Sequence, residues 1–124
     1  RETYTGITDR DRALTVTAIA EEVKRSLNGG GHDFAAHFRT PGHMALLRAA
    51  DRLLDERRGQ TELSIALAAM ADVTPAVTIC EMLDDDTGFA LSKEGAVEYA
   101  RKHGLVVVEG QDVLDRWESQ KQGR

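Results

Sequence analysis

Apolar residues recur with a helical period along the first quarter of the chain. Successive members of the stripe are five, four and four residues apart, which places them on one side of a helix. The stripe consists of Leu14, Ile19, Val23 and Leu27. Thr8, with acids just after it, has the character of a helix N-cap, and the Asn-Gly-Gly-Gly run at 28–31 marks the other end. The pattern predicts a helix between these two signals.

Two further helices are predicted in the middle of the chain. The first follows a Thr-Pro-Gly turn and carries an apolar face made of Met44, Leu47, Ala50 and Leu54. Gly59 is a plausible stop for this helix. Thr61 then opens a second helix, which is rich in alanine and therefore suited to close packing.

The hydrophobic pattern changes after Pro75. Residues 76–80 and 105–108 are short, apolar and β-branched, which predicts two buried strands. Between them lies a helix capped by Ser92 and ended by Gly104. A strand, a helix and a strand in this order favour an α/β fold. A short amphipathic helix at 112–118 and a frayed end at 119–124 follow.

Size and charge narrow the possible classes of protein. The chain has 124 residues, enough for one domain, and a net charge of −5, which opposes binding to nucleic acid. A small DNA-binding helical domain, suggested by the adjacent helices around Arg57, is disfavoured for the same reason. Charged residues interrupt every apolar stretch well short of about 20 residues, so no membrane span is expected. Cys80 is the single cysteine, which fits a reducing compartment, and a cytoplasmic location is expected.

Two segments carry candidate chemistry in the middle of the chain. His43 follows the Pro-Gly turn, and an imidazole at a cleft gains and loses protons near neutral pH. The alternative is a surface histidine at the start of a helix. At 57–62 the sequence Arg-Arg-Gly-Gln-Thr-Glu forms a glycine-containing turn before a helix, which suits an anion. The alternative is a connection between helices with solvated arginines.

Two acidic features follow the first predicted strand. Glu81 comes directly after this strand, and the carboxyl end of a strand in an α/β sheet is where ligands tend to bind. Glu81 is therefore a candidate general base, with a solvated acid as the alternative. The three aspartates at 84–86 lack the alternating ligands of a calcium loop and are interpreted as a solvated turn.

Taken together, four segments resemble the ordered signatures of the 3,4-dihydroxy-2-butanone 4-phosphate synthases. They are residues 5–12 (Thr-Gly-Ile-Thr-Asp-Arg-Asp-Arg), 39–43 (Arg-Thr-Pro-Gly-His), 57–62 (Arg-Arg-Gly-Gln-Thr-Glu) and 79–82 (Ile-Cys-Glu-Met). A Lys-His-Gly helix end at 102–104 follows in the expected order. Each motif is weak by itself, but their order and spacing are specific, and the resemblance extends from about residue 4 to about residue 114.

The resemblance implies an α/β fold with a mixed sheet flanked by helices, in which residues 1–124 are the C-terminal part of a single family domain. It implies a lyase of riboflavin biosynthesis that converts D-ribulose 5-phosphate to formate and 3,4-dihydroxy-2-butanone 4-phosphate. It also implies a homodimer with active sites at the subunit interface, and a divalent cation, Mg²⁺ or Mn²⁺.

The resemblance also assigns roles to residues. His43 and Glu81 match the essential acid–base groups. The turn that matches the substrate and phosphate contacts comprises Arg57, Arg58, Gly59, Gln60 and Thr61, and Glu81 adds a further substrate contact. Thr5 and Arg12 lie in another segment that corresponds to the surroundings of the site.

Two departures from the family pattern matter. The family's first half carries an acidic loop with a metal-binding glutamate, and no equivalent precedes Arg1. Gln60 stands where the family usually has a metal-binding histidine, and an amide oxygen is a neutral ligand of another shape. These departures motivate an alternative: a non-catalytic relic that binds a phosphosugar or dimerises.

Overall fold

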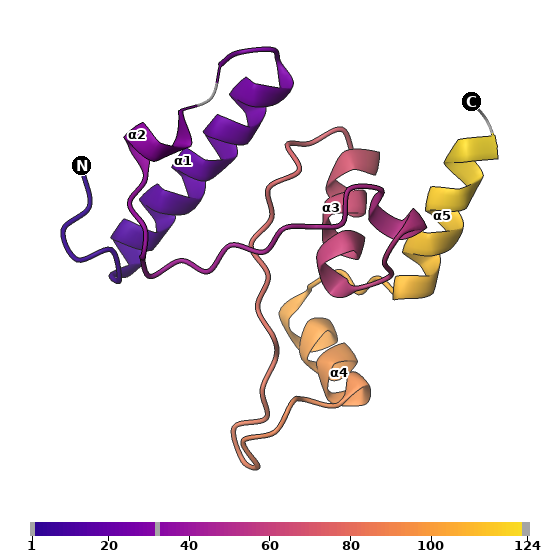
Figure 1. Ribbon diagram of the computed structural model, residues 1–124. Coiled ribbons are helices and arrows are strands. Elements are labelled where there is room, and N and C mark those ends of the chain that lie inside the picture. The colour runs from indigo at the N-terminus through magenta and orange to yellow at the C-terminus, as the bar shows by residue number, and fades with distance from the viewer. Residues whose placement is uncertain (1, 32, 123–124) are drawn as a thin grey trace. The chain divides into compact units, whose positions relative to one another are not determined.

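The computed structural model describes residues 2–31 and 33–122 (Figure 1). The regular elements of this part of the chain are all helical. They are α1 (Asp9–Leu27), α2 (Phe34–His37), the 3-10 helix η1 (Leu53–Asp55), α3 (Gln60–Met70), α4 (Lys93–His103) and α5 (Gly110–Gln122). None of the helices described here is long and apolar enough to cross a membrane.

The chain divides into two compact units, Arg1–Thr78 and Ile79–Arg124. The first unit contains α1, α2, η1 and α3, and the second contains α4 and α5. Each unit is described by itself below. The assignment of residues 1–124 to one family domain stays a prediction.

The predicted first helix is confirmed as α1. The Thr8 side chain accepts a hydrogen bond from the backbone N–H of Asp11 at 3.2 Å, which satisfies one donor of the first turn. At the other end, the backbone N–H of Asn28 donates to the carbonyl of Lys24, and the glycines that follow leave the helix.

The prediction of a helix from Met44 through Leu54 is wrong. Residues 45–50 have no regular structure, and only Leu53–Asp55 form a short 3-10 turn, in which Leu53 has a positive φ of 47°. The backbone N–H of Ala50 donates to the Glu62 carboxylate at 3.0 Å instead of to a carbonyl four residues earlier. A tertiary hydrogen bond thus replaces the helical one, which overrides a favourable apolar spacing.

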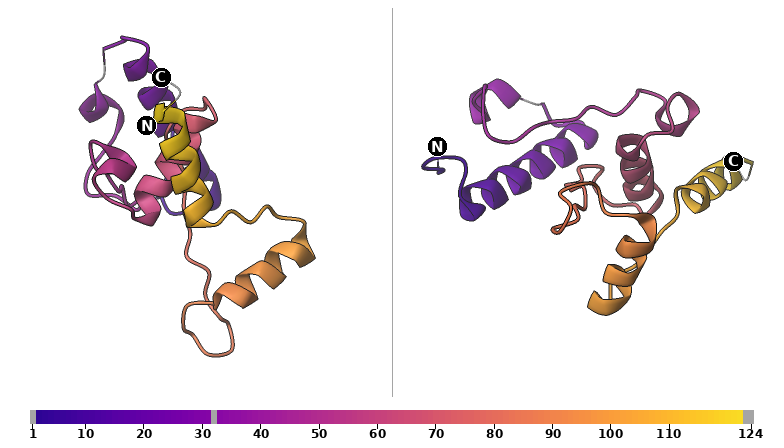
Figure 2. Two further views of the ribbon diagram at one scale, coloured as in Figure 1. Left: turned by 90° about the vertical axis from the view of Figure 1, so that its right-hand side faces the viewer. Right: turned by 90° about the horizontal axis from the view of Figure 1, so that it is seen from below.

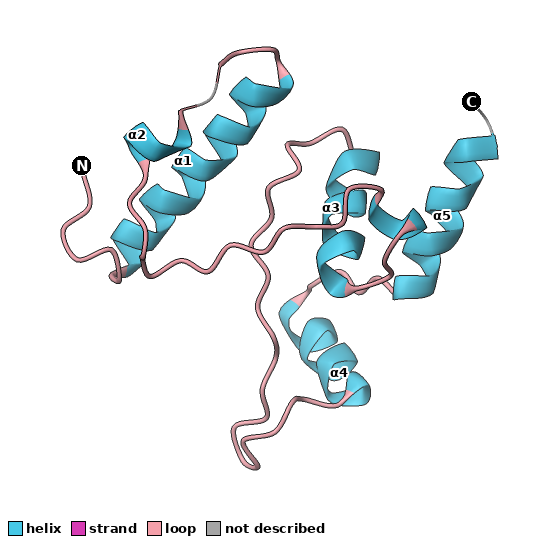
Figure 3. Ribbon diagram, in the orientation of Figure 1, coloured by secondary structure: helices cyan, strands magenta, loops and turns pink. Residues whose placement is uncertain are grey.

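The predicted α/β fold with its mixed sheet is also wrong. The part of the chain that the structure describes contains no strand, and residues 76–80 and 105–108 run as loops (Figure 3). Its β pairing is limited to an isolated antiparallel bridge between Leu83 and Ala90. β-Branched residues favour an extended backbone, but a strand forms only where a second segment supplies hydrogen-bond partners. These two apolar segments have the composition of strands without such a partner.

The second unit confirms the helices predicted there. Ser92 caps α4 by accepting from the backbone N–H of Gly95 at 3.1 Å, and Gly104 ends the helix with a left-handed φ of 65°. The loop at 105–109 leads from α4 into α5, as the two views of Figure 2 show. Helix α5 continues to Gln122, so the frayed end expected at 119–124 is helical up to that residue, and residues 123–124 lie outside the described part.

Few side chains are fully buried in either unit. In the first unit, Leu54 of η1 and the alanines Ala66 and Ala68 of α3 are buried, and η1 packs against α3. In the second unit, Ala100 and Val113 are buried. The small core of the first unit therefore lies directly beside the turn at 57–61, which the resemblance assigns to substrate binding.

Candidate functional site

His43 lies in an exposed bend that follows α2, rather than at the start of a helix. The bend begins with the Thr40–Pro41 peptide bond, which is cis. The imidazole faces the backbone of Gly6: a Cβ built on Gly6 would be 3.4 Å from His43 Cδ2. The structure thus brings together two of the segments identified in the sequence, 5–12 and 39–43.

The Tyr4–Thr5–Gly6 loop, which contacts His43, is anchored by Asp11. The carboxylate of Asp11 accepts hydrogen bonds from the backbone N–H groups of Tyr4, Thr5 and Gly6, the last at 2.8 Å. These bonds hold the pKa of Asp11 below its ordinary value, with the bond from Gly6 as the largest cause. Asp11 is buried although it lies in the first turn of a helix, where acids are commonly solvated.

The turn at 57–61 leads into α3 with Gly59 at the N-cap. Gly59 has no side chain, and no side-chain hydrogen bond caps this end of the helix. The carboxylate of Glu62 lies close to this end, since a Cβ built on Gly59 would be 2.7 Å from its Oε2. The side chain of Arg57 is 66% exposed and that of Gln60 is also exposed. The anion-binding role of this turn stays a prediction.

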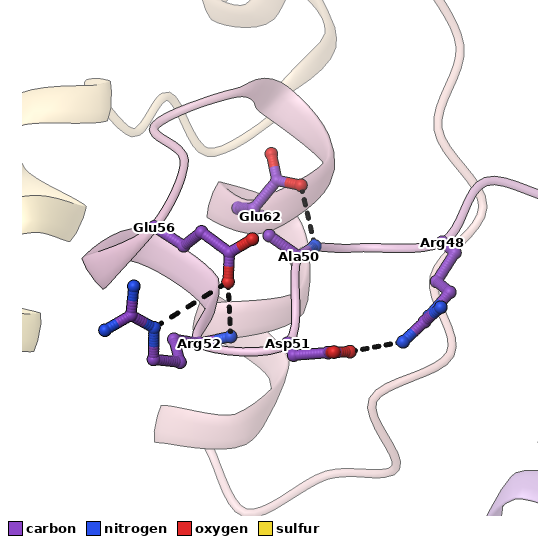
Figure 4. A network of polar contacts seen from close by, with 6 residues as sticks. All are labelled: Arg48, Ala50, Asp51, Arg52, Glu56 and Glu62. Carbon is purple, nitrogen blue, oxygen red and sulfur yellow. Dashed lines mark hydrogen bonds and ion pairs between the residues drawn. The ribbon is translucent and has the colours of Figure 1, made fainter.

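The side chain of Glu62 holds the 57–61 turn in place. Its Oε1 accepts from the backbone N–H of Ala50 and lies 3.5 Å from Nη1 of Arg57. The bond from Ala50 is the largest cause that lowers the pKa of Glu62, and the charge of Arg57 adds to it. Oε2 of Glu62 is buried and accepts no hydrogen bond from the described residues. Figure 4 shows Glu62 reaching from α3 to Ala50.

A surface pocket of about 290 Å³ lies between the 48–51 segment and α3. Its lining includes Arg48, Asp51, Glu56, Arg57 and Glu62. The side chains of Arg48 and Asp51 form an ion pair, which Figure 4 shows. The guanidinium groups at this pocket are thus held beside carboxylates of the chain, while most of Arg57 remains accessible to an anion.

Glu81 belongs to the second compact unit, so the structure describes it apart from His43. It is exposed in a loop, and its carbonyl oxygen lies 3.5 Å from the Sγ of Cys80. The strand that was predicted to precede Glu81 is absent from the described residues. Its role as an acid–base group therefore stays a prediction.

The other predicted substrate contacts are placed as follows. The Thr5 hydroxyl lies 3.4 Å from the Asp11 carboxylate and 3.4 Å from the backbone N of Ile7, so it is already used within the loop. The Arg12 side chain is exposed on α1. Arg58 is exposed and Thr61 is half-buried at the start of α3. None of these roles is tested by the geometry, and they stay predictions.

A divalent cation would require several donors in one place. The described residues contain no group of three or more His, Cys, Asp or Glu side chains that could hold a metal ion. Gln60 presents a single neutral amide oxygen from an exposed position. The described residues by themselves do not fit a complete metal site.

Asp11 and Glu62 lie in matched segments of the sequence, but the sequence assigned neither of them a role of its own. Both stand in the first turn of a helix, where an acid normally complements the helix dipole from solvent. Only the tertiary hydrogen bonds show that each carboxylate instead reaches another segment. For Glu62, its position three residues after the Gly59 N-cap is a weak local signal.

Comparison with known proteins gives a consistent answer. A family model described as 3,4-dihydroxy-2-butanone 4-phosphate synthase matches residues 1–116. The chain is 59% identical over 117 residues to the 3,4-dihydroxy-2-butanone 4-phosphate synthase of Methanosarcina acetivorans, covering 94% of this chain and 47% of that protein. It is 38% identical over 113 residues to the riboflavin biosynthesis protein RibBA of Aquifex aeolicus, covering 90% of this chain and 25% of that protein.

A solved structure agrees with the sequence relatives. The crystal structure of the Candida albicans 3,4-dihydroxy-2-butanone 4-phosphate synthase matches with a TM-score of 0.76 at 33% identity, covering 94% of this chain and 55% of that one. The chain spans about half the length of the curated relatives from Methanosarcina and Archaeoglobus that it matches. The family match over residues 1–116, together with these relatives, shows that the chain belongs to the 3,4-dihydroxy-2-butanone 4-phosphate synthase family.

Proposed function

We propose that the protein is a lyase that converts D-ribulose 5-phosphate to formate and 3,4-dihydroxy-2-butanone 4-phosphate in riboflavin biosynthesis. Its family membership carries this proposal, because the relatives bear the name of that enzyme. The active protein includes the part of the family sequence that this chain does not span. Two residues in matching motifs, His43 and Glu81, supply the acid–base groups that the reaction needs.

The first step removes a proton next to a carbonyl and gives an enediolate. Such a step requires a positioned base and a proton donor on the oxygen where negative charge develops. His43 is suited to this exchange because it is exposed, and the Gly6 backbone fixes one side of its ring. Glu81 shares the later proton transfers.

The phosphate of the substrate binds at the turn before α3. Arg57 supplies a guanidinium group, and the backbone at Gly59, Gln60 and Thr61 supplies N–H donors at the start of the helix. Arg58 adds charge nearby, and Thr5 and Arg12 contribute from the segment next to His43. Binding energy from the phosphate orients the reacting carbons for the proton transfers.

Three further parts of the proposal follow from the family. A divalent cation, Mg²⁺ or Mn²⁺, stabilises developing negative charge on oxygen when it is bound, with Gln60 as the one donor that this chain offers in the matching motif. The protein acts as a homodimer, with its sites at the subunit interface. It works in the cytoplasm.

The test is formate release from ribulose 5-phosphate by the full-length protein in the presence of Mg²⁺. We expect turnover in the wild type, and a fall in kcat of about 10²- to 10⁴-fold in His43→Ala and in Glu81→Gln. The matched control is His37→Gln, because His37 is an exposed histidine in the same unit but outside the matched motifs.

A Gln60→His variant separates the remaining outcomes. Turnover in the wild type shows that glutamine is tolerated in the motif. Turnover only in Gln60→His would show a sound scaffold whose metal site has been lost. If both proteins release no formate, the lyase proposal is wrong, and the non-catalytic phosphosugar-binding or dimerising relic becomes the better account.

A further inference from the structure

Asp11 is a buried carboxylate for which the proposed chemistry has no use. Asp11 is 5% exposed, and among the described residues its carboxylate accepts hydrogen bonds from the segment that precedes its own helix. The donors are the backbone N–H groups of Tyr4 at 3.3 Å, Thr5 at 3.0 Å and Gly6 at 2.8 Å. The Thr5 hydroxyl lies at 3.4 Å.

These bonds do not serve the helix dipole alone. The backbone N–H of Asp11 in the first turn of α1 is bonded separately, to the side chain of Thr8. An acid that only complemented the dipole would stay solvated and face the helix N–H groups. The Asp11 carboxylate instead accepts hydrogen bonds from three consecutive backbone N–H groups, those of residues 4–6. These bonds fix the conformation of that loop.

The fixed loop is the surface on which His43 lies. Gly6 has a left-handed φ of 76°, and a Cβ on this residue would come within 3.4 Å of His43 Cδ2. The imidazole therefore lies close to Gly6, the residue whose N–H makes the shortest bond to Asp11. A shift of this loop would move the ring or leave it without support on that side.

We propose that Asp11 is a positioning residue for His43, acting through the backbone of the Tyr4–Gly6 loop. The inference rests on the proposed function, in which His43 moves a proton to or from the substrate. Asp11 touches no reacting atom itself. Its effect is on where the imidazole stands, and proton transfer is sensitive to displacements of about 1 Å.

The decisive variant is Asp11→Asn in the full-length protein. The amide keeps the size of the side chain but loses its charge, and it replaces one acceptor by a donor that faces N–H groups. The matched control is Glu21→Gln, which removes one charge from an exposed position on the same helix. Three quantities are measured: kcat and KM for formate release, the NMR signals of the His43 ring, and the unfolding midpoint.

We expect kcat of Asp11→Asn to fall about ten- to a hundredfold, with KM changed by less than about twofold, because orientation is lost rather than binding. The Cδ2–H signal of His43 shifts, while the ring signals of His37 and His103 stay in place. Glu21→Gln leaves all of these values at the wild-type level. An unmoved His43 signal, or a kcat equal to that of Glu21→Gln, would overturn the proposal.

A measurement on the unmutated protein covers the case in which Asp11→Asn does not fold. Hydrogen exchange at the Gly6 amide is expected to be at least about tenfold slower than in an unstructured chain, because the bond to a buried carboxylate closes it. Exchange at the unstructured rate would sink the proposal. Turnover by the wild type distinguishes a failure of the proposed lyase function from a failure of the proposed coupling between Asp11 and His43. An inactive wild type with the expected His43 shift refutes the lyase but keeps the coupling. An active wild type with an equally active Asp11→Asn refutes only the coupling.

Discussion

The carboxylate of Glu62 accepts a hydrogen bond from the backbone N–H of Ala50 at 3.0 Å, across twelve residues of the chain. The same oxygen lies 3.5 Å from the guanidinium of Arg57. One side chain in the first turn of α3 therefore holds both the irregular 45–50 segment and the arginine assigned to the phosphate. The shape of the proposed anion site depends on this residue, whose side chain is buried.

Glu62 should make stability depend on pH in the acidic range. Its pKa is lowered in the folded state from an ordinary value of 4.5, so the folded protein binds the proton more weakly than the unfolded chain does. The stabilisation is therefore fully present above 4.5 and is lost as the pH falls through the lower folded value. We expect Glu62→Gln to unfold more readily at pH 7 and to lose less stability than the wild type on acidification. Urea unfolding at pH 7, 5 and 4 measures this, and parallel curves for the two proteins would contradict it.

A methyl group at Gly59 should disturb the turn. A Cβ at this position would lie 2.7 Å from Oε2 of Glu62 and 3.3 Å from Cζ of Arg57. We expect Gly59→Ala to cost about 1–3 kcal/mol, as overpacking does, and to weaken binding of the substrate phosphate. Gly31→Ala is the control, because a Cβ at Gly31 meets nothing within 4 Å. Equal unfolding free energies for the two variants would show that the turn adapts freely.

Leu54 should carry much of the stability of the first unit. It is 3% exposed in η1, which packs against α3. Truncation in Leu54→Ala should cost about 2–5 kcal/mol through lost burial and the cavity left behind. Leu46 has the same side chain and is 59% exposed, so Leu46→Ala should stay within about 0.5 kcal/mol of the wild type. Chemical unfolding measures both, and a cost below 1 kcal/mol for Leu54→Ala would mean that η1 contributes little.

The cap of α4 should be measurable in the second unit. Ser92 accepts from the backbone N–H of Gly95 at 3.1 Å, so Ser92→Ala leaves that donor without its partner and should cost about 1 kcal/mol. Ser119 on α5 is the control, because its hydroxyl donates to the Arg116 carbonyl inside a helix, where alanine is at least as favourable. Hydrogen exchange of the α4 amides is the measurement. Unchanged protection in Ser92→Ala would show that the cap is not needed.

The identity of the chain was accessible from its sequence, because it depends on the order of short motifs. The family assignment made from residues 5–12, 39–43, 57–62 and 79–82 is confirmed by the match over residues 1–116. The roles of His43, Glu81 and the residues of the turn remain predictions. What the structure adds is that the His43 ring lies close to Gly6, that Asp11 accepts a bond from the backbone N–H of Gly6, and that Glu62 accepts one from the backbone N–H of Ala50.

The sequence by itself determined the helices that carry their own end signals. Helix α1 begins after Thr8, and α4 lies between Ser92 and Gly104, because capping bonds join residues a few positions apart. Only the tertiary structure decided the fate of the other segments. The 44–54 segment does not form the predicted helix, and the backbone N–H of Ala50 bonds to Glu62 instead. Residues 76–80 and 105–108 form no strand in the described part of the chain. A helix closes its hydrogen bonds within one segment, whereas a strand or a tertiary bond needs a second segment, which local composition cannot supply.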